Sequence, residues 1–220
     1  MTRIQVALAI EAAGVMPLFY HPDPEVCCEV ARACYAGGLR VIEFTNRGPG
    51  AHEAFQALRA FANRELPGMV LGVGSIVDAG TTSLFLQLGA DFIVSPILNP
   101  DMARVCNRRK VLWSPGCSTL SEISQAEELG AELVKIFPGD ILGPTFVKAI
   151  KGPCPWTSII VTGGVSPTRE SLQAWFSAGV TCAGMGSKLI TPELLKARDY
   201  DGLREQVREL VAIVAELRGR

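Results

Sequence analysis

Hydrophobic positions along the chain alternate between short apolar runs and longer stretches with helical spacing. The short runs predict strands at residues 15–19, 39–45, 69–73, 92–95, 111–113, 133–137, 158–162 and 181–185. The longer stretches predict helices at residues 2–13, 24–36, 50–63, 77–88, 100–107, 119–129, 144–150 and 168–177, and a long C-terminal helix that ends near residue 217. After the opening helix, the chain therefore consists of eight strand-then-helix units.

Glycines close several of these predicted helices immediately before the next strand. They are Gly37, Gly89, Gly130 and Gly179, and such positions are typical of helix C-caps. Regular alternation indicates parallel strands joined by right-handed crossovers. Eight units favour a closed (β/α)₈ TIM barrel, with an extra N-terminal helix, over an open doubly wound sheet. No linker or low-complexity segment interrupts the pattern, so we expect one domain over residues 1–220.

Composition narrows the function classes. The chain has 220 residues, of which 48% are hydrophobic, and a net charge of −1 with interspersed signs. This charge pattern indicates neither nucleic-acid nor membrane binding. We find no secretion signal and no apolar run long enough to span a bilayer. The seven cysteines form no C-x-x-C pair and the two histidines are isolated. We therefore expect reduced thiols, a cytoplasmic location and no metal site.

Lys135 is the most informative residue, because it lies inside the apolar run predicted as the sixth strand. A buried lysine is costly as a cation, and desolvation lowers its pKa so that the neutral amine can attack a carbonyl. The alternative is a snorkelling side chain or a buried ion pair. Lys188 follows a glycine-rich turn instead, where it would meet phosphate or solvent.

Charged side chains also mark the end of the second predicted strand, where a barrel carries its active site. Glu43 is either a proton-transfer group inside the barrel or part of a structural salt bridge, depending on which face of the strand it occupies. A nearby carboxylate would raise the pKa of a lysine amine, whereas burial would lower it. Arg47, four residues later, either grips a carboxylate or is solvated.

Glycines follow the seventh and eighth predicted strands, in Thr162-Gly163-Gly164 and in Gly186-Ser187. Loops after these two strands often bind phosphate in barrels, through backbone N–H groups that glycine leaves accessible. Each motif alone is a generic turn, but the two together indicate an anion site.

Taken together, these motifs resemble those of the class I 2-keto-3-deoxy-6-phosphogluconate (KDPG) and 4-hydroxy-2-oxoglutarate (KHG) aldolase family. The resemblance rests on Glu43-Phe44-Thr45-Asn46-Arg47, on Lys135-Ile136-Phe137-Pro138 and on the glycine-rich strand ends, and extends over nearly the whole chain. It implies a (β/α)₈ barrel that assembles as a homotrimer and acts on a small keto-acid phosphate. The implied reaction is the cleavage of KDPG to pyruvate and glyceraldehyde 3-phosphate, without a cofactor.

The resemblance also implies roles for ten residues. Lys135 would form the Schiff base, Glu43 would be the general acid/base, and Arg47 would hold the substrate carboxylate. Ser75 and Pro96 would touch the pyruvate portion. The phosphate and distal hydroxyl would be lined by Thr162, Gly163, Gly164, Gly186 and Ser187. Ser75, Asn46 and Cys117 depart from the commoner family pattern. The departures at Asn46 and Cys117 bear on the identity of the distal half of the substrate more than on the chemistry.

Three other functions stay open at this point. The same chemistry could act on the 6-phosphogalactonate epimer or on KHG, which would yield pyruvate and glyoxylate. A phosphosugar isomerase or epimerase barrel would form no imine. A catalytically silent phosphosugar-binding barrel would not need Lys135, Glu43 and Arg47 together.

Overall fold

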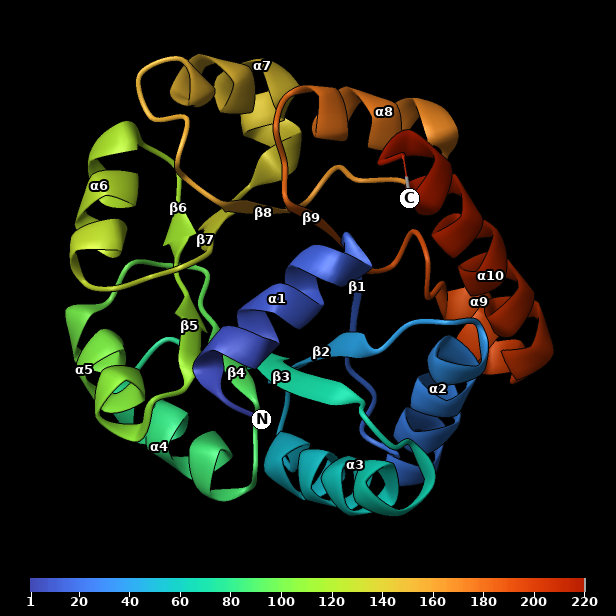
Figure 1. Ribbon diagram of the computed structural model, residues 1–220. Coiled ribbons are helices and arrows are strands. Elements are labelled where there is room, and N and C mark those ends of the chain that lie inside the picture. Colours follow the sequence, from blue (N-terminus) through green and yellow to red (C-terminus); the bar gives the residue numbers. More distant parts are fainter. Residues whose placement is uncertain (220) are drawn as a thin grey trace.

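Parallel strands form a ring that is surrounded by helices (Figure 1). The computed structural model describes residues 1–219. Within this range the strands are β1 (Val15–Phe19), β2 (Val41–Thr45), β3 (Val70–Gly74), β4 (Phe92–Val94), β5 (Leu112–Ser114), β6 (Gly116–Cys117), β7 (Val134–Ile136), β8 (Ile159–Thr162) and β9 (Cys182–Met185). Each paired neighbour runs parallel, as the alternating pattern predicted.

The ring closes through the segment that contains β5 and β6. The strand order is β5-β4-β3-β2-β1-β9-β8-β7-β6, and Pro115 alone separates the two strands at its ends. On one side of this segment, the backbone N–H of Ser95 donates to Ser114 at 3.0 Å. On the other, the backbone N–H of Lys135 donates to Pro115 at 2.8 Å. The fifth predicted strand is therefore longer than expected and split at proline, which has no N–H to donate. The (β/α)₈ prediction is confirmed.

The helices follow the predicted alternation. They are α1 (Arg3–Ala13), α2 (Pro24–Ala36), α3 (Ala51–Glu65), α4 (Ala79–Gln87), α5 (Pro100–Arg109), α6 (Leu120–Glu128), α7 (Gly139–Lys151), α8 (Arg169–Ser177), α9 (Pro192–Ala197) and α10 (Tyr200–Leu217).

Two helices are preceded by short helical segments that the sequence did not predict. The helix predicted at residues 144–150 starts at Pro144, but Gly143 (φ 72°) joins it to a short helical turn that begins at Gly139. The C-terminal helix is preceded by the separate short helix α9, which ends at Arg198 in a left-handed conformation. Asp199 then caps α10 by accepting a hydrogen bond from the Gly202 N–H.

Local signals define the helix ends that lead into and out of the barrel. Thr119 and Glu122 form a capping box at the start of α6. Gly89 and Gly130 follow α4 and α6 with φ values of 92° and 86°, the conformation expected of glycine at a helix end. These caps allow short connections between each helix and the next strand.

The barrel interior has an apolar layer at one end and a polar layer at the other. Alternation along β2 points Val41 inward, into a cluster with Val6 and Ile10 of α1, while Ile42 joins the core between strands and helices. Helix α1 crosses this end of the barrel (Figure 1). Side chains two residues further along the strands therefore face inward above the apolar layer, toward the carboxyl ends.

Candidate active site

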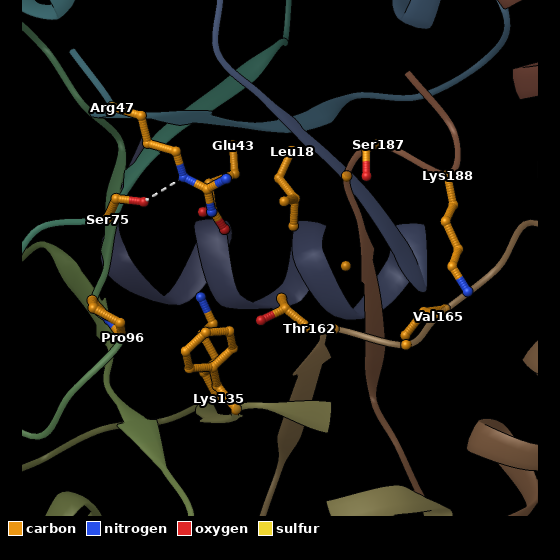
Figure 2. Close-up of a pocket in the computed structure, with 15 residues that line it drawn as sticks. Leu18, Glu43, Arg47, Ser75, Pro96, Lys135, Thr162, Val165, Ser187 and Lys188 are labelled. Atoms are coloured by element: carbon orange, nitrogen blue, oxygen red, sulfur yellow. Dashed lines mark hydrogen bonds between the residues drawn. The ribbon is translucent and has the colours of Figure 1, made fainter. Parts of the chain in front are cut away.

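A cavity of about 240 Å³ opens at the carboxyl ends of the strands and brings together all ten predicted site residues (Figure 2). They are Glu43, Arg47, Ser75, Pro96, Lys135, Thr162, Gly163, Gly164, Gly186 and Ser187. The structure adds four lining residues to which the sequence assigned no role: Leu18, Phe137, Val165 and Gly184. It also places Lys188 at the cavity, a residue for which the sequence left phosphate and solvent open as contacts. Strand parity could have found Phe137, because it lies two residues from Lys135.

Lys135 extends from β7 into this cavity with only 6% of its surface exposed. Its strand is held between β6 and β8, where it pairs with Gly116 and Ile160. The Nζ atom lies 4.9 Å from the centre of the Phe137 ring. Burial lowers the pKa of the Lys135 amine, and the opposing effect of Glu43 does not cancel it. The effect of burial on the Lys135 pKa therefore outweighs that of the nearby carboxylate, and it favours the neutral amine.

Glu43 on β2 is the counterpart of this lysine. Its side chain points toward the Lys135 amine in Figure 2, and only 1% of the residue is exposed. Burial raises the pKa of the Glu43 carboxyl, while Lys135 and Arg47 oppose the rise. Oε2 has no hydrogen-bond partner within residues 1–219. Burial thus shifts the pKa values of both groups in the direction of their uncharged forms, and one carboxyl oxygen is free for a ligand.

Inward positions without side chains make room for these groups. Gly184 on β9 lines the cavity, and Gly74 on β3 lies against the Glu43 side chain. A methyl group on Gly184 would lie 2.5 Å from Cγ2 of Thr162, which leaves no space for it. The hydroxyl of Thr162 is buried and has no protein partner in the described part of the chain, so it too is available to a ligand.

Arg47 and Ser75 form one end of the cavity. The Nε of Arg47 donates a hydrogen bond to Oγ of Ser75 at 3.2 Å (Figure 2). Ser75 has a φ of 61°, which is uncommon for a residue other than glycine and is often found at functional sites. This conformation and the hydrogen bond aim a guanidinium into the cavity, where it can bind a carboxylate.

The opposite end is built from the loops after β8 and β9. Gly163 and Gly164 have φ values of 93° and 73°, and the Asp140 side chain at the start of α7 lies against both. Ser187 and Lys188 follow β9, and the Lys188 Nζ donates to Oγ of Ser166 at 3.0 Å.

The two unusual residues Asn46 and Cys117 do not line this cavity. The Asn46 backbone N–H donates to Gly74 at 2.9 Å, and the buried Cys117 thiol faces the Pro115 carbonyl at 3.7 Å. The expectation that they alter the distal half of a ligand therefore has no support in their positions. Within residues 1–219, no three His, Cys, Asp or Glu side chains are grouped so that they could hold a metal ion.

Comparisons with known proteins agree with this geometry. The family model for KDPG and KHG aldolase matches residues 6–206. A 2-dehydro-3-deoxy-phosphogluconate aldolase from Pseudoalteromonas atlantica is 32% identical over 199 residues, which is 90% of each chain. A 2-dehydro-3-deoxy-6-phosphogalactonate aldolase from Escherichia coli is 30% identical over 154 residues, which is 69% of this chain and 72% of the relative.

Among solved structures, the KDPG aldolase from Legionella pneumophila superposes with a TM-score of 0.83 at 25% identity, covering 92% of this chain and 96% of that one. In that crystal structure, pyruvate was captured as a covalent carbinolamine intermediate.

Proposed function

The chain belongs to the KDPG and KHG aldolase family, and we propose that it cleaves KDPG to pyruvate and glyceraldehyde 3-phosphate through a Schiff base on Lys135. It is an aldolase, a carbon–carbon lyase. The observation that carries the proposal is the buried Lys135 amine, which faces Glu43 in a cavity where burial favours the neutral form of both groups.

When the amine is neutral and the Glu43 carboxyl is protonated, the pair holds the one proton that imine formation needs. The Lys135 amine adds to the C2 ketone, and Glu43 donates its proton so that the C2 oxygen leaves as water. The products are a cationic imine and a Glu43 carboxylate. Glu43 has then become a base at the moment when a base is required.

Carbon–carbon cleavage follows from this charge state. The Glu43 carboxylate removes the proton of the C4 hydroxyl, the C3–C4 bond breaks, and its electron pair passes to the imine to give a neutral enamine. The aldehyde leaves, and Glu43 returns its proton to C3. Water then hydrolyses the imine, which releases pyruvate and restores the neutral pair after proton transfer from Lys135 to Glu43. No metal or organic cofactor is required in this scheme.

The order of groups along the cavity supports a 2-keto acid with a distal anion. Arg47 and Ser75 would hold the C1 carboxylate, next to the Lys135 amine that attacks C2. Pro96 would contact the pyruvate portion. The remaining residues would bind the distal hydroxyl and phosphate through backbone N–H groups and hydroxyls: Thr162, Gly163, Gly164, Gly186 and Ser187. The galactonate aldolase among the relatives keeps the C4 epimer as the second candidate substrate.

Trapping with borohydride tests the proposal. Pyruvate plus borohydride should add the mass of one reduced pyruvate adduct, located on Lys135 by peptide mapping, and should inactivate the enzyme. Lys135→Arg should show neither the adduct nor turnover, because a guanidinium stays protonated and cannot form this imine. Labelling at a different lysine, or cleavage of KDPG without an adduct, would reject the assignment.

We further propose a single domain over residues 1–220, a homotrimer and a cytoplasmic location. Exposed apolar side chains on α4, α6 and the loops before α4 and α5 support burial against other subunits: Val77, Leu84, Ile97 and Leu120. No helix within residues 1–219 has the length and apolar composition that crossing a membrane requires. Native mass spectrometry would detect the trimer, and a purely monomeric species would contradict it.

A further inference from the structure

We propose that Lys188 is the cation that binds the distal anion of the substrate and selects phosphorylated over neutral substrates, and that Ser166 positions it. This inference rests on the proposed aldolase function and goes beyond it, because the site residues assigned above include no positive charge at the distal end.

Lys188 lies at the end of the cavity that is opposite Arg47 and Ser75. Lys188 comes directly after Ser187 in the loop that follows β9, and it lines the same cavity as Lys135. Figure 2 shows its side chain extending toward Val165, on the side of the cavity away from Arg47 and Ser75. A substrate held by its carboxylate at Arg47 would therefore direct its far end toward Lys188.

The hydrogen-bond partner of Lys188 leaves its charge unneutralised. The Nζ atom donates to the neutral hydroxyl of Ser166 at 3.0 Å, and no carboxylate in the described part of the chain forms an ion pair with it. An ammonium group has three donors, so two remain for a ligand. Ser166 lies in the loop after β8, and the hydrogen bond ties the loops that follow β8 and β9 together across the distal end of the cavity.

The charges at the distal end of the cavity indicate why a lysine is needed there to bind an anion. Asp140 lies against Gly163 and Gly164, so a carboxylate is already present beside the backbone that would receive the anion. Backbone N–H groups alone would bind a doubly charged phosphate against this repulsion. The Lys188 ammonium, which lines the same cavity, would supply the attractive point charge that lysine commonly contributes to phosphate binding. The ligand chemistry is thus a terminal phosphate monoester or a terminal carboxylate.

Substrate ratios test the proposal. We would measure kcat/KM for KDPG and for its unphosphorylated six-carbon analogue, and take the ratio of the two. In Lys188→Met this ratio should fall about tenfold, which corresponds to the weaker end of charge-assisted hydrogen bonds because the lysine is exposed. Lys188→Arg should restore most of the ratio. Ser166→Ala should raise KM for KDPG a few-fold with little change in kcat.

Controls separate charge at the cavity from charge elsewhere. Lys148→Met removes another exposed lysine, on α7 and outside the cavity, and should leave the ratio as in the parent. Added salt should lower the ratio of the parent more than that of Lys188→Met, since screening acts on the charge that the variant lacks. KHG, which ends in a carboxylate, distinguishes the two anions: equal sensitivity of KHG and KDPG to Lys188→Met would assign a general anion site instead of a phosphate site.

Failure of the Lys188 proposal can be distinguished from failure of the proposed aldolase function. A parent enzyme that cleaves KDPG, combined with an unchanged ratio in Lys188→Met, would overturn only this inference. An equal loss for both six-carbon substrates would also overturn it, because Lys188 would then merely hold its loop. A parent enzyme that forms no adduct with pyruvate and cleaves neither substrate would overturn the proposed function, and this inference with it.

Discussion

Gly74 and Glu43 occupy adjacent strands so closely that a methyl group on Gly74 would lie 1.7 Å from Oε1 of Glu43. The next nearest atoms of that methyl group would also belong to Glu43, at 2.5 Å and 3.0 Å. The absence of a side chain at Gly74 is therefore what allows the carboxyl to point at Lys135.

Gly74→Ala should displace the Glu43 carboxyl while the barrel remains folded, because the clash is with the end of a flexible side chain. We expect turnover to fall by about 10²–10⁴-fold, the range for loss of a general acid/base. Steady-state kinetics and a thermal melt measure the two effects. Parental turnover in a folded Gly74→Ala protein would show that the position of Glu43 is not critical.

Glu43→Gln tests the carboxyl itself. Because burial already favours the uncharged carboxyl, an isosteric amide should be tolerated and the melting temperature should not fall. Turnover should nevertheless fall by about 10²–10⁴-fold, since an amide cannot transfer the proton. If kcat stayed near the parental value, Glu43 would be structural and another proton donor would have to be sought.

The buried lysine should appear in the pH dependence of stability. The folded pKa of Lys135 lies below its ordinary value of 10.5, so the unfolded chain binds more protons between the two values. Stability of the parent should therefore rise with pH in this window, by up to about 1.4 kcal/mol per pH unit. Lys135→Met should lack this contribution. Urea unfolding of both proteins between pH 7 and pH 10 measures it, and parallel curves would contradict the lowered pKa.

Ser75 should matter for substrate binding more than for chemistry. Ser75→Ala removes the acceptor that orients Arg47, and we expect KM for KDPG to rise about tenfold, as for the loss of one hydrogen bond near a charged group. Ser75→Gly should show the same KM but a higher melting temperature, because glycine adopts the φ of 61° without strain. Unchanged KM in both variants would remove Ser75 from the carboxylate site.

Gly186 is a cleaner probe of the phosphate site than Gly164. A side chain on Gly164 would meet the Asp140 backbone at 2.8 Å in a left-handed conformation, so its replacement would strain the fold for every substrate. The nearest atoms to a methyl on Gly186 would all belong to Leu18, with the side chain at 3.0 Å and the backbone carbonyl at an ordinary contact distance of 3.6 Å. Gly186→Ala should therefore reduce kcat/KM for KDPG more than for its unphosphorylated analogue. Equal losses would show that Gly186 only turns the chain.

The sequence predicted the barrel because its main signals are local. The apolar periodicity, the capping residues and the helix-ending glycines each depend only on residues that are close in sequence. Eight repeats of strand and helix then favour a closed barrel. For the same reason the sequence placed Lys135, Glu43 and Arg47 near the carboxyl ends of strands. It missed the split at Pro115 and the short helical turn before Gly143, where single proline and glycine residues interrupt an otherwise regular pattern.

The tertiary structure alone decided what the site residues face. Whether Glu43 points into the barrel depends on the register of β2 against β1 and β3, which strands distant in sequence determine. Whether burial or a carboxylate controls the pKa of Lys135 depends on how much protein surrounds the amine. The space at Gly74, the contact between Lys188 and Ser166, and the exclusion of Asn46 and Cys117 from the cavity likewise arise from packing between separate units. Periodicity along a chain specifies which elements form, but desolvation, clashes and hydrogen bonds between elements exist only once the barrel has closed.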